Sequence, residues 1–168
     1  ELCGLEMLDS AGSHALCCAE GGHNAVTRAF FQDIAVCDPN AGLETPGLIP
    51  GSGLRPADIL TRALGHGFTA LDLGIISPDT VRLNQACLDV MYARKKNKYA
   101  EHEETLDRQN IVYQPLIFSC YGRPRPRTTA ILRTIAKRVA RRRGCGGAEH
   151  RYQRLRAKIG AEIWARGA

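Results

Sequence analysis

Residues 54–78, LRPADILTRALGHGFTALDLGIISP, decide the fold, because they are expected to form two neighbouring strands of a hairpin. Pro56 suits the start of the first strand, and the Gly-His-Gly sequence at 65–67 turns the chain back. In the second strand, residues 68–76, leucines alternate with small residues, and Asp72 lies among the small ones. The hairpin therefore places two acids, Asp58 and Asp72, on adjacent strands.

Two carboxylates within reach of each other can share one divalent cation. Mg²⁺ takes one or two protein carboxylates and completes its coordination with water and substrate phosphate, and Mn²⁺ is an alternative. This donor set is typical of phosphodiester chemistry, and Glu44, in a short strand expected within residues 41–53, could add a third acid. The alternative is that Asp58 is a polar residue beside a turn and Asp72 lies on a solvated face, and the spacing alone does not decide between them.

The remaining apolar patterns predict an α/β fold with a small mixed sheet, in the order helix, three strands, helix, strand, helix. Helices are expected over residues 24–37, 80–106 (with Asp79 as N-cap), 128–143 and 150–166, and a buried strand over residues 111–120. The apolar stripe of the long helix includes Lys95, with Lys98 to one side of it. A lysine in such a stripe usually extends to solvent, but this one could reach the carboxylate pair.

The chain has 168 residues, a length that is enough for one hydrophobic core. Charge is distributed unevenly along it. Residues 1–122 carry 9 Lys/Arg and 15 Asp/Glu, and residues 123–168 carry 14 and 2. The basic part predicts a surface for a polyanion, with DNA the first candidate and RNA the second, although a solvated Arg-rich helix is the alternative. The candidate DNA-binding residues are Arg123, Arg125, Arg127, Lys137, Arg138, Arg141, Arg142 and Arg143.

Cysteine and histidine gather in the first 23 residues, which have little material for a core. Cys3, His14 and Cys18, with His23 in reserve, predict a partial zinc knuckle holding structural Zn²⁺, and scattered free thiols are the alternative. Seven cysteines, an odd number, and the lack of a visible signal peptide predict a nuclear or other reducing intracellular location rather than secretion. The start at Glu1 predicts a fragment of a longer protein.

The segments RPADIL (55–60), ALDLGIISP (70–78), ARKKNKY (93–99) and PLIFSCYG (115–122) together resemble the PD-(D/E)xK restriction-endonuclease-like fold. With the Cys/His segment before them, they resemble the zinc-knuckle and endonuclease module that follows the reverse transcriptase in site-specific non-LTR retrotransposon proteins. The resemblance implies a zinc knuckle at 1–23, a nuclease core at 24–143 and a basic C-terminal helix at 144–168.

That family uses two acids to hold the metal at the scissile phosphate and a lysine to stabilise charge. The resemblance implies that Asp58 and Asp72 are metal ligands and that Lys95 or Lys98 is the catalytic cation of a DNA nickase that primes reverse transcription. Gly74 stands where the family usually has its lysine, so a helical lysine must substitute. A catalytically dead nucleic-acid-binding module with a relict nuclease fold is the alternative.

Overall fold

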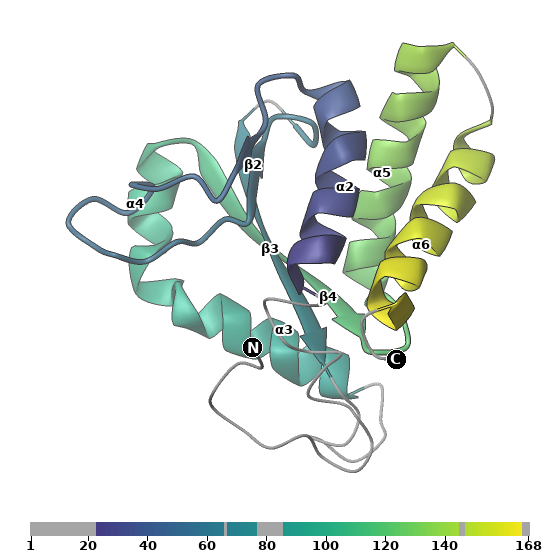
Figure 1. Ribbon diagram of the computed structural model, residues 1–168. Coiled ribbons are helices and arrows are strands. Elements are labelled where there is room, and N and C mark those ends of the chain that lie inside the picture. The colour runs from purple at the N-terminus through teal and green to yellow at the C-terminus, as the bar shows by residue number, and fades with distance from the viewer. Residues whose placement is uncertain (1–22, 66, 77–85, 145–146, 166–168) are drawn as a thin grey trace.

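The computed structural model describes residues 23–65, 67–76, 86–144 and 147–165 (Figure 1). It confirms the predicted α/β class, because a four-stranded mixed sheet is covered by helices on its two faces. No helix in the described ranges combines the length and apolar character needed to cross a membrane.

The sheet contains β1 (Gly42–Leu43), β2 (Ile59–Thr61), β3 (Phe68–Ile76) and β4 (Ile111–Ser119), in that order. The first three strands are antiparallel neighbours, and β4 runs parallel to β3 along its whole length. A hairpin is therefore present within the predicted stretch, and its second strand lies in the middle of the sheet. Its first strand is shorter than predicted, because it begins at Ile59, so Asp58 lies just before the strand rather than in it. Apolar side chains fill β3 and β4, as expected of strands buried on both faces.

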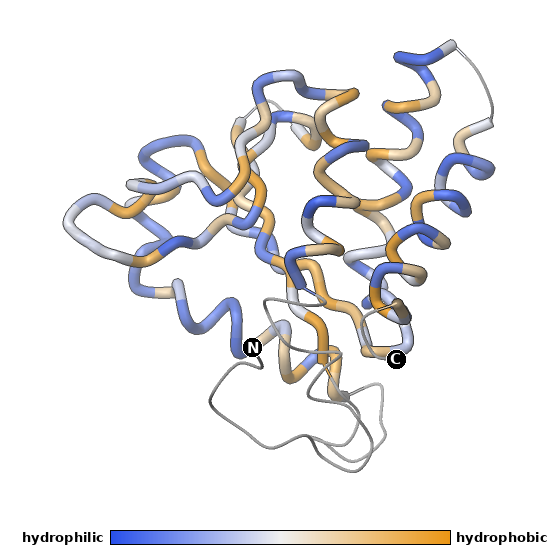
Figure 2. Tube along the Cα trace, in the orientation of Figure 1, coloured by the Kyte–Doolittle hydropathy of each residue, from blue (hydrophilic) through white to orange (hydrophobic). Residues whose placement is uncertain are grey.

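One face of the sheet is covered by three helices, α2 (Asn24–Cys37), α5 (Pro126–Arg143) and α6 (Ala148–Ala165). Their positions agree with the predicted helices to within two residues at each end. Pro126 suits the first turn of α5, and Gly144 ends that helix with a φ of 60°. The central strands are largely hydrophobic in Figure 2, whereas α5 and α6 alternate between hydrophobic and hydrophilic positions. The main core lies between this helical layer and the strands.

The other face carries α3 (Ala86–Lys98), the 3₁₀ turn η3 (Ala100–His102) and α4 (Glu103–Arg108). The prediction of one continuous helix to residue 106 was wrong, because the chain breaks at Tyr99; its start, with Asp79, lies outside the described residues. A continuous helix would carry Leu106 about 10 Å beyond Tyr99. The break instead brings both side chains into one buried cluster with Ile111.

Strand β4 forms one edge of the sheet, and its two halves differ. The second half is covered by the following loop and the first turn of α5: Arg125 N–H donates to the carbonyl of Ile117, and the Ile117 N–H donates to Thr128 Oγ1, both at 2.9 Å. In the first half, no loop backbone group of the described part of the chain bonds to residues 112–116, and the Pro115 carbonyl accepts from the Gln114 side chain at 2.9 Å. The Val112 side chain is 58% exposed.

Candidate active site at the edge of strand β3

Strand β2 is short and leaves part of the β3 edge without a strand partner. The pairing of β2 with β3 begins at Ile59, opposite Leu71. Beyond Leu71, side chains make hydrogen bonds to the β3 backbone in place of a strand. The Leu73 N–H donates to Asp58 Oδ2 at 2.6 Å, and the Leu73 carbonyl lies 3.2 Å from His23 Nε2. His23 Nε2 also lies 3.1 Å from Asp58 Oδ2, so we assign its proton to this nitrogen, which faces two acceptors. The edge of β3 thus fixes both side chains.

Asp72 lies in β3, level with Asp58 by extension of the β2–β3 register. Lys95, in the last turn of α3, extends inward rather than to solvent, and its Nζ lies 2.6 Å from Asp72 Oδ1. The hydroxyl of Tyr113, in β4, donates to Asp72 Oδ2. Asp72 is 8% exposed, so a buried carboxylate is held between a cation and a phenol. Helix α3 and strand β4 therefore position this group.

Gly74 provides the space through which Lys95 reaches Asp72. A Cβ atom at position 74 would lie 2.7 Å from Lys95 Cε, closer than such atoms pack, and 3.1 Å from Ile117 Cδ1, a tight contact. The aliphatic part of Lys95 thus crosses β3 over the glycine. A side chain two positions after Asp72 and the observed path of Lys95 exclude each other.

The electrostatics of the site follow from burial beside charge. Burial raises the pKa of Asp72, and the opposing effects of Lys95 and Tyr113 do not cancel that rise. Burial and the neighbouring Asp72 raise the pKa of Tyr113, so its hydroxyl remains a donor at neutral pH. Burial alone would lower the pKa of His23, but the hydrogen bond to Asp58 and the charge of Asp58 outweigh it and raise the pKa.

A pocket of about 550 Å³ lies beside the two aspartates. Its lining is rich in basic side chains, because Arg94, Lys95 and Lys98 contribute to it together with His23 and the β3 backbone around Gly74. Lys98 therefore lies near the site, although its Nζ is 5.0 Å from the Tyr99 ring centre and Lys95 makes the contact with Asp72. Positive charge beside a carboxylate pair suits a phosphate group.

The other acid considered from the sequence does not join this pair. Glu44 is exposed and lies 3.8 Å from Arg55, also exposed. Within the described ranges, no three His, Cys, Asp or Glu side chains lie close enough together to hold a metal ion between them.

Of the residues predicted to bind zinc, only His23 lies in the described part of the chain. Cys3, His14 and Cys18 lie outside the described residues, and the reserve ligand His23 contacts Asp58 at the edge of β3 instead.

Two of the predicted DNA-binding residues, Arg125 and Arg127, make contacts within the fold. The Nε of Arg125 lies 2.6 Å from Asp89, and its guanidinium stacks 4.1 Å from the Tyr92 ring centre. Arg127 donates to Gln114 at 3.3 Å. The exposed residues among all the predicted DNA-binding residues are Arg123, Arg127, Lys137, Arg141, Arg142 and Arg143.

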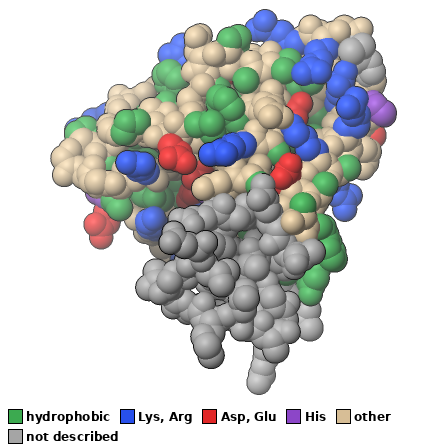
Figure 3. Space-filling model, in the orientation of Figure 1, with side chains coloured by type: hydrophobic (Ala, Val, Ile, Leu, Met, Phe, Trp, Pro, Cys, Tyr) green, Lys and Arg blue, Asp and Glu red, His purple; other side chains and the backbone are tan. Residues whose placement is uncertain are grey.

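Three other predicted DNA-binding residues lie together near the C-terminal end of α5. Arg138, Arg141 and Arg142 line a pocket of about 310 Å³ with Cys37 from the end of α2. Burial raises the pKa of the Cys37 thiol. The upper right of Figure 3, where α5 and α6 lie, shows many basic side chains. This end of the molecule has the charge expected of a polyanion surface.

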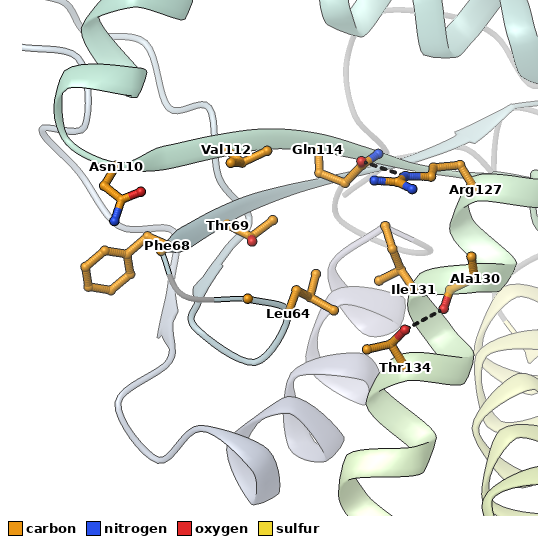
Figure 4. A pocket seen from close by; sticks show the side chains of 12 residues that line it. Leu64, Phe68, Thr69, Asn110, Val112, Gln114, Arg127, Ala130, Ile131 and Thr134 are labelled. Carbon is orange, nitrogen blue, oxygen red and sulfur yellow. Dashed lines mark hydrogen bonds between the residues drawn. The ribbon is translucent and has the colours of Figure 1, made fainter.

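A further pocket, of about 390 Å³, lies between the first halves of β3 and β4 and helix α5 (Figure 4). Thr69, Val112 and Gln114 line it from the strands, and Thr134 lines it from the helix. Arg127 is the one titratable side chain among the described residues that line it.

Sequence reasoning missed Tyr113 and assigned His23 to zinc. The contact of Tyr113 with Asp72 depends on the parallel register that sets Tyr113 beside Ala70, and no local pattern carries that register across the intervening helices. A signal for His23 existed, since it lies at the start of an amphipathic helix that must pack on the sheet.

Comparison of the chain with protein-family models, with curated proteins and with solved structures finds no significant match. The function is therefore inferred from the residues themselves.

Proposed function

We propose that the chain is a metal-dependent endonuclease domain that nicks DNA, as the resemblance to the retrotransposon module implies. One observation carries the proposal: the Lys95 amino group lies 2.6 Å from buried Asp72, level with Asp58, beside a pocket lined by further cations. A buried ion pair alone is weak evidence of function, because such pairs also occur in structural networks. The additional basic side chains around this pair favour a phosphate substrate.

The two aspartates suit Mg²⁺ or Mn²⁺. Both ions prefer carboxylate oxygens, and Mg²⁺ sites often have one or two protein carboxylates. Asp72 also fits electrostatically, because burial raises its pKa and an added cation would favour the ionised form. When bound, such a cation supplies Lewis-acid stabilisation of the charge that develops on a phosphate.

Each protein group then has a distinct task. Lys95 donates a hydrogen bond to a phosphate oxygen and offsets its charge. Tyr113 holds Asp72 in orientation, and His23 does the same for Asp58. Lys98 lines the same pocket and binds phosphate beside the reacting one.

The proposal extends to the partners of the domain. Duplex DNA is the expected substrate, bound in part by the arginines of α5, and RNA is the second candidate. In the natural parent an upstream reverse transcriptase would extend the nicked end. The zinc knuckle implied for residues 1–23 remains part of this proposal.

The test is a plasmid-nicking assay. Supercoiled DNA should become open circular with Mg²⁺ or Mn²⁺ and remain supercoiled in EDTA. Wild-type protein that is folded and binds DNA, yet nicks with neither ion, would overturn the proposal.

One observation favours the second candidate, a nucleic-acid-binding module without catalysis. Both Asp72 oxygens already have protein donors, in Lys95 and Tyr113. Metal binding raises the melting temperature of a protein that has a metal site. A relict site would show DNA binding, no nicking and no rise in melting temperature with Mg²⁺ or Mn²⁺.

A further inference from the structure

Two large aromatic side chains lie exposed and close together on the surface. Tyr121 and Trp164 are each 60% exposed, and their ring centres are 6.1 Å apart at an interplanar angle of 45°. They come from the loop after β4 and from the end of α6. Large aromatic side chains usually gain stability by burial, so an exposed pair indicates a contact surface.

The Tyr121 backbone is held in a tightly bonded turn. The N–H groups of Tyr121 and Arg123 donate to Ser119 Oγ at 3.3 and 3.1 Å, and the Gly122 N–H donates to the Ser119 carbonyl at 2.9 Å. Cys120 N–H donates to the carbonyl of Ile76, at the end of β3. The turn therefore presents the ring from a fixed support.

A close contact between two glycines brings this turn to α6. Gly122 has a φ of 74°, and a Cβ atom there would lie 3.3 Å from Gly160 Cα. Trp164 lies four residues after Gly160 on the same helix, so it occupies the same side one turn further along. The pairing of Tyr121 with Trp164 thus follows from the backbone packing.

The surroundings of the pair indicate what binds there. Arg123 is exposed and lies two residues from Tyr121. The turn is bonded to Ile76, and the preceding residue, Ile75, lines the pocket beside the aspartates. Aromatic faces combined with positive charge are the chemistry that binds single-stranded nucleic acid.

We propose that Tyr121 and Trp164 form a stacking platform for an unpaired base of nucleic acid next to the candidate active site. This inference rests on the proposed function, because it assumes a nucleic-acid substrate. A paired base inside a duplex has no free face for stacking, so the platform selects a strand that has been separated at the site. The bases of such a strand would stack on Tyr121 and Trp164, and its phosphates would bind basic residues nearby.

Tryptophan fluorescence tests the platform directly, because Trp164 is the single tryptophan of the chain. The whole chain is titrated in EDTA with a single-stranded oligonucleotide and with a blunt duplex of the same length. We expect the single strand to quench the emission and the duplex to leave it nearly unchanged. Equal quenching by both, or none by either while labelled DNA shows binding, would overturn the inference.

Substitutions supply the second test. Tyr121→Leu should weaken single-strand binding roughly 5- to 100-fold, which is the range for loss of one base–aromatic stack, and leave duplex binding unchanged. Tyr121→Phe should bind as wild type, because it keeps the ring. Val112→Ala, at another exposed apolar position, is the matched control, and circular dichroism checks folding in each case.

Two outcomes separate this inference from the nuclease proposal. Asp72→Asn protein that does not nick but shows the wild-type difference between single strand and duplex would support the platform alone. Protein that nicks but does not show the difference would overturn the platform alone. Should sedimentation reveal a dimer that Tyr121→Leu dissociates, the pair would be a contact between copies, and the inference would be wrong.

Discussion

The absence of a side chain at position 74 lets a lysine from a helix reach the carboxylate of Asp72. Gly74→Ala would place a methyl group 2.7 Å from Lys95 Cε, so the lysine must move. We expect initial nicking rates to fall on the order of 10²-fold, as for loss of one preorganised donor. The melting temperature should fall modestly, because the flexible lysine can yield but the buried Ile117 side chain, 3.1 Å from the new methyl group, must also shift.

A paired substitution provides the control. Lys95→Ala should cost a similar factor, and adding Gly74→Lys to it should recover part of the rate by supplying the cation from β3. Lys98→Ala is the matched single change, and its loss should be smaller. A folded double variant no faster than Lys95→Ala would contradict the idea that a cation beside Asp72 suffices.

Asp72 itself gives the second prediction at this scale. Asp72→Asn should abolish nicking and leave duplex affinity intact, since removing a negative charge cannot weaken attraction to a polyanion. Its melting temperature at neutral pH should not fall, because burial raises the pKa of Asp72 and makes ionisation unfavourable in the folded protein. Asp107→Asn, at an exposed acid, is the control, and nicking by Asp72→Asn at the wild-type rate would refute the assignment.

At the scale of elements, Asp38 joins the end of α2 to strand β2. Its Oδ2 accepts hydrogen bonds from Thr61 Oγ1 at 2.7 Å and from the Arg62 N–H at 2.6 Å, and its Oδ1 accepts one from the Asn40 N–H at 3.1 Å. Asp38→Ala should therefore lower the free energy of unfolding by about 1 to 3 kcal/mol, measured by urea denaturation.

The same hydrogen bonds make the free energy of unfolding depend on pH. Burial acts to raise the pKa of Asp38, but the bonds from Arg62 and Thr61 outweigh it, and the pKa lies below its ordinary value. The unfolded chain then binds more protons than the folded one, so the stabilisation is complete above the ordinary pKa and is lost as pH falls through the lowered one. The difference in stability between wild type and Asp38→Asn should shrink on acidification below about pH 4. A difference that grows there would contradict the sign.

Local patterns predicted most elements, because apolar periodicity reports which face of a segment is buried. These patterns correctly predicted helix α2 and strand β3. The predicted long helix was wrong at the break after Lys98, where tertiary packing overrides the local pattern. The two aspartates and Lys95 were found from the hairpin and the helix stripe. The contact of Tyr113 with Asp72 was not, since it depends on a register set by the whole sheet.

For the whole molecule, the basic end of α5 should dominate nucleic-acid affinity. Changing Arg141 and Arg142 to Gln should weaken duplex binding and reduce the slope of log affinity against log salt by up to about 2, near 0.9 for each phosphate that is no longer neutralised. The control changes Arg55 and Arg108, which alter net charge equally but lie beside Glu44 and Glu104. Equal effects of the two double variants would mean that net charge alone, and not this surface, governs binding.

The open half of strand β4 has a consequence for how the protein behaves when concentrated. Pro115 interrupts this edge, because it has no N–H and its carbonyl accepts from Gln114 Nε2 at 2.9 Å. Before Pro115, the strand offers its outward backbone groups to another extended chain, and the 58% exposed Val112 adds an apolar contact there. Copies of this chain should therefore tend to aggregate by joining their sheets edge to edge. A lysine in place of Val112 would repel such a neighbour, and light scattering of concentrated samples should then rise more slowly with time.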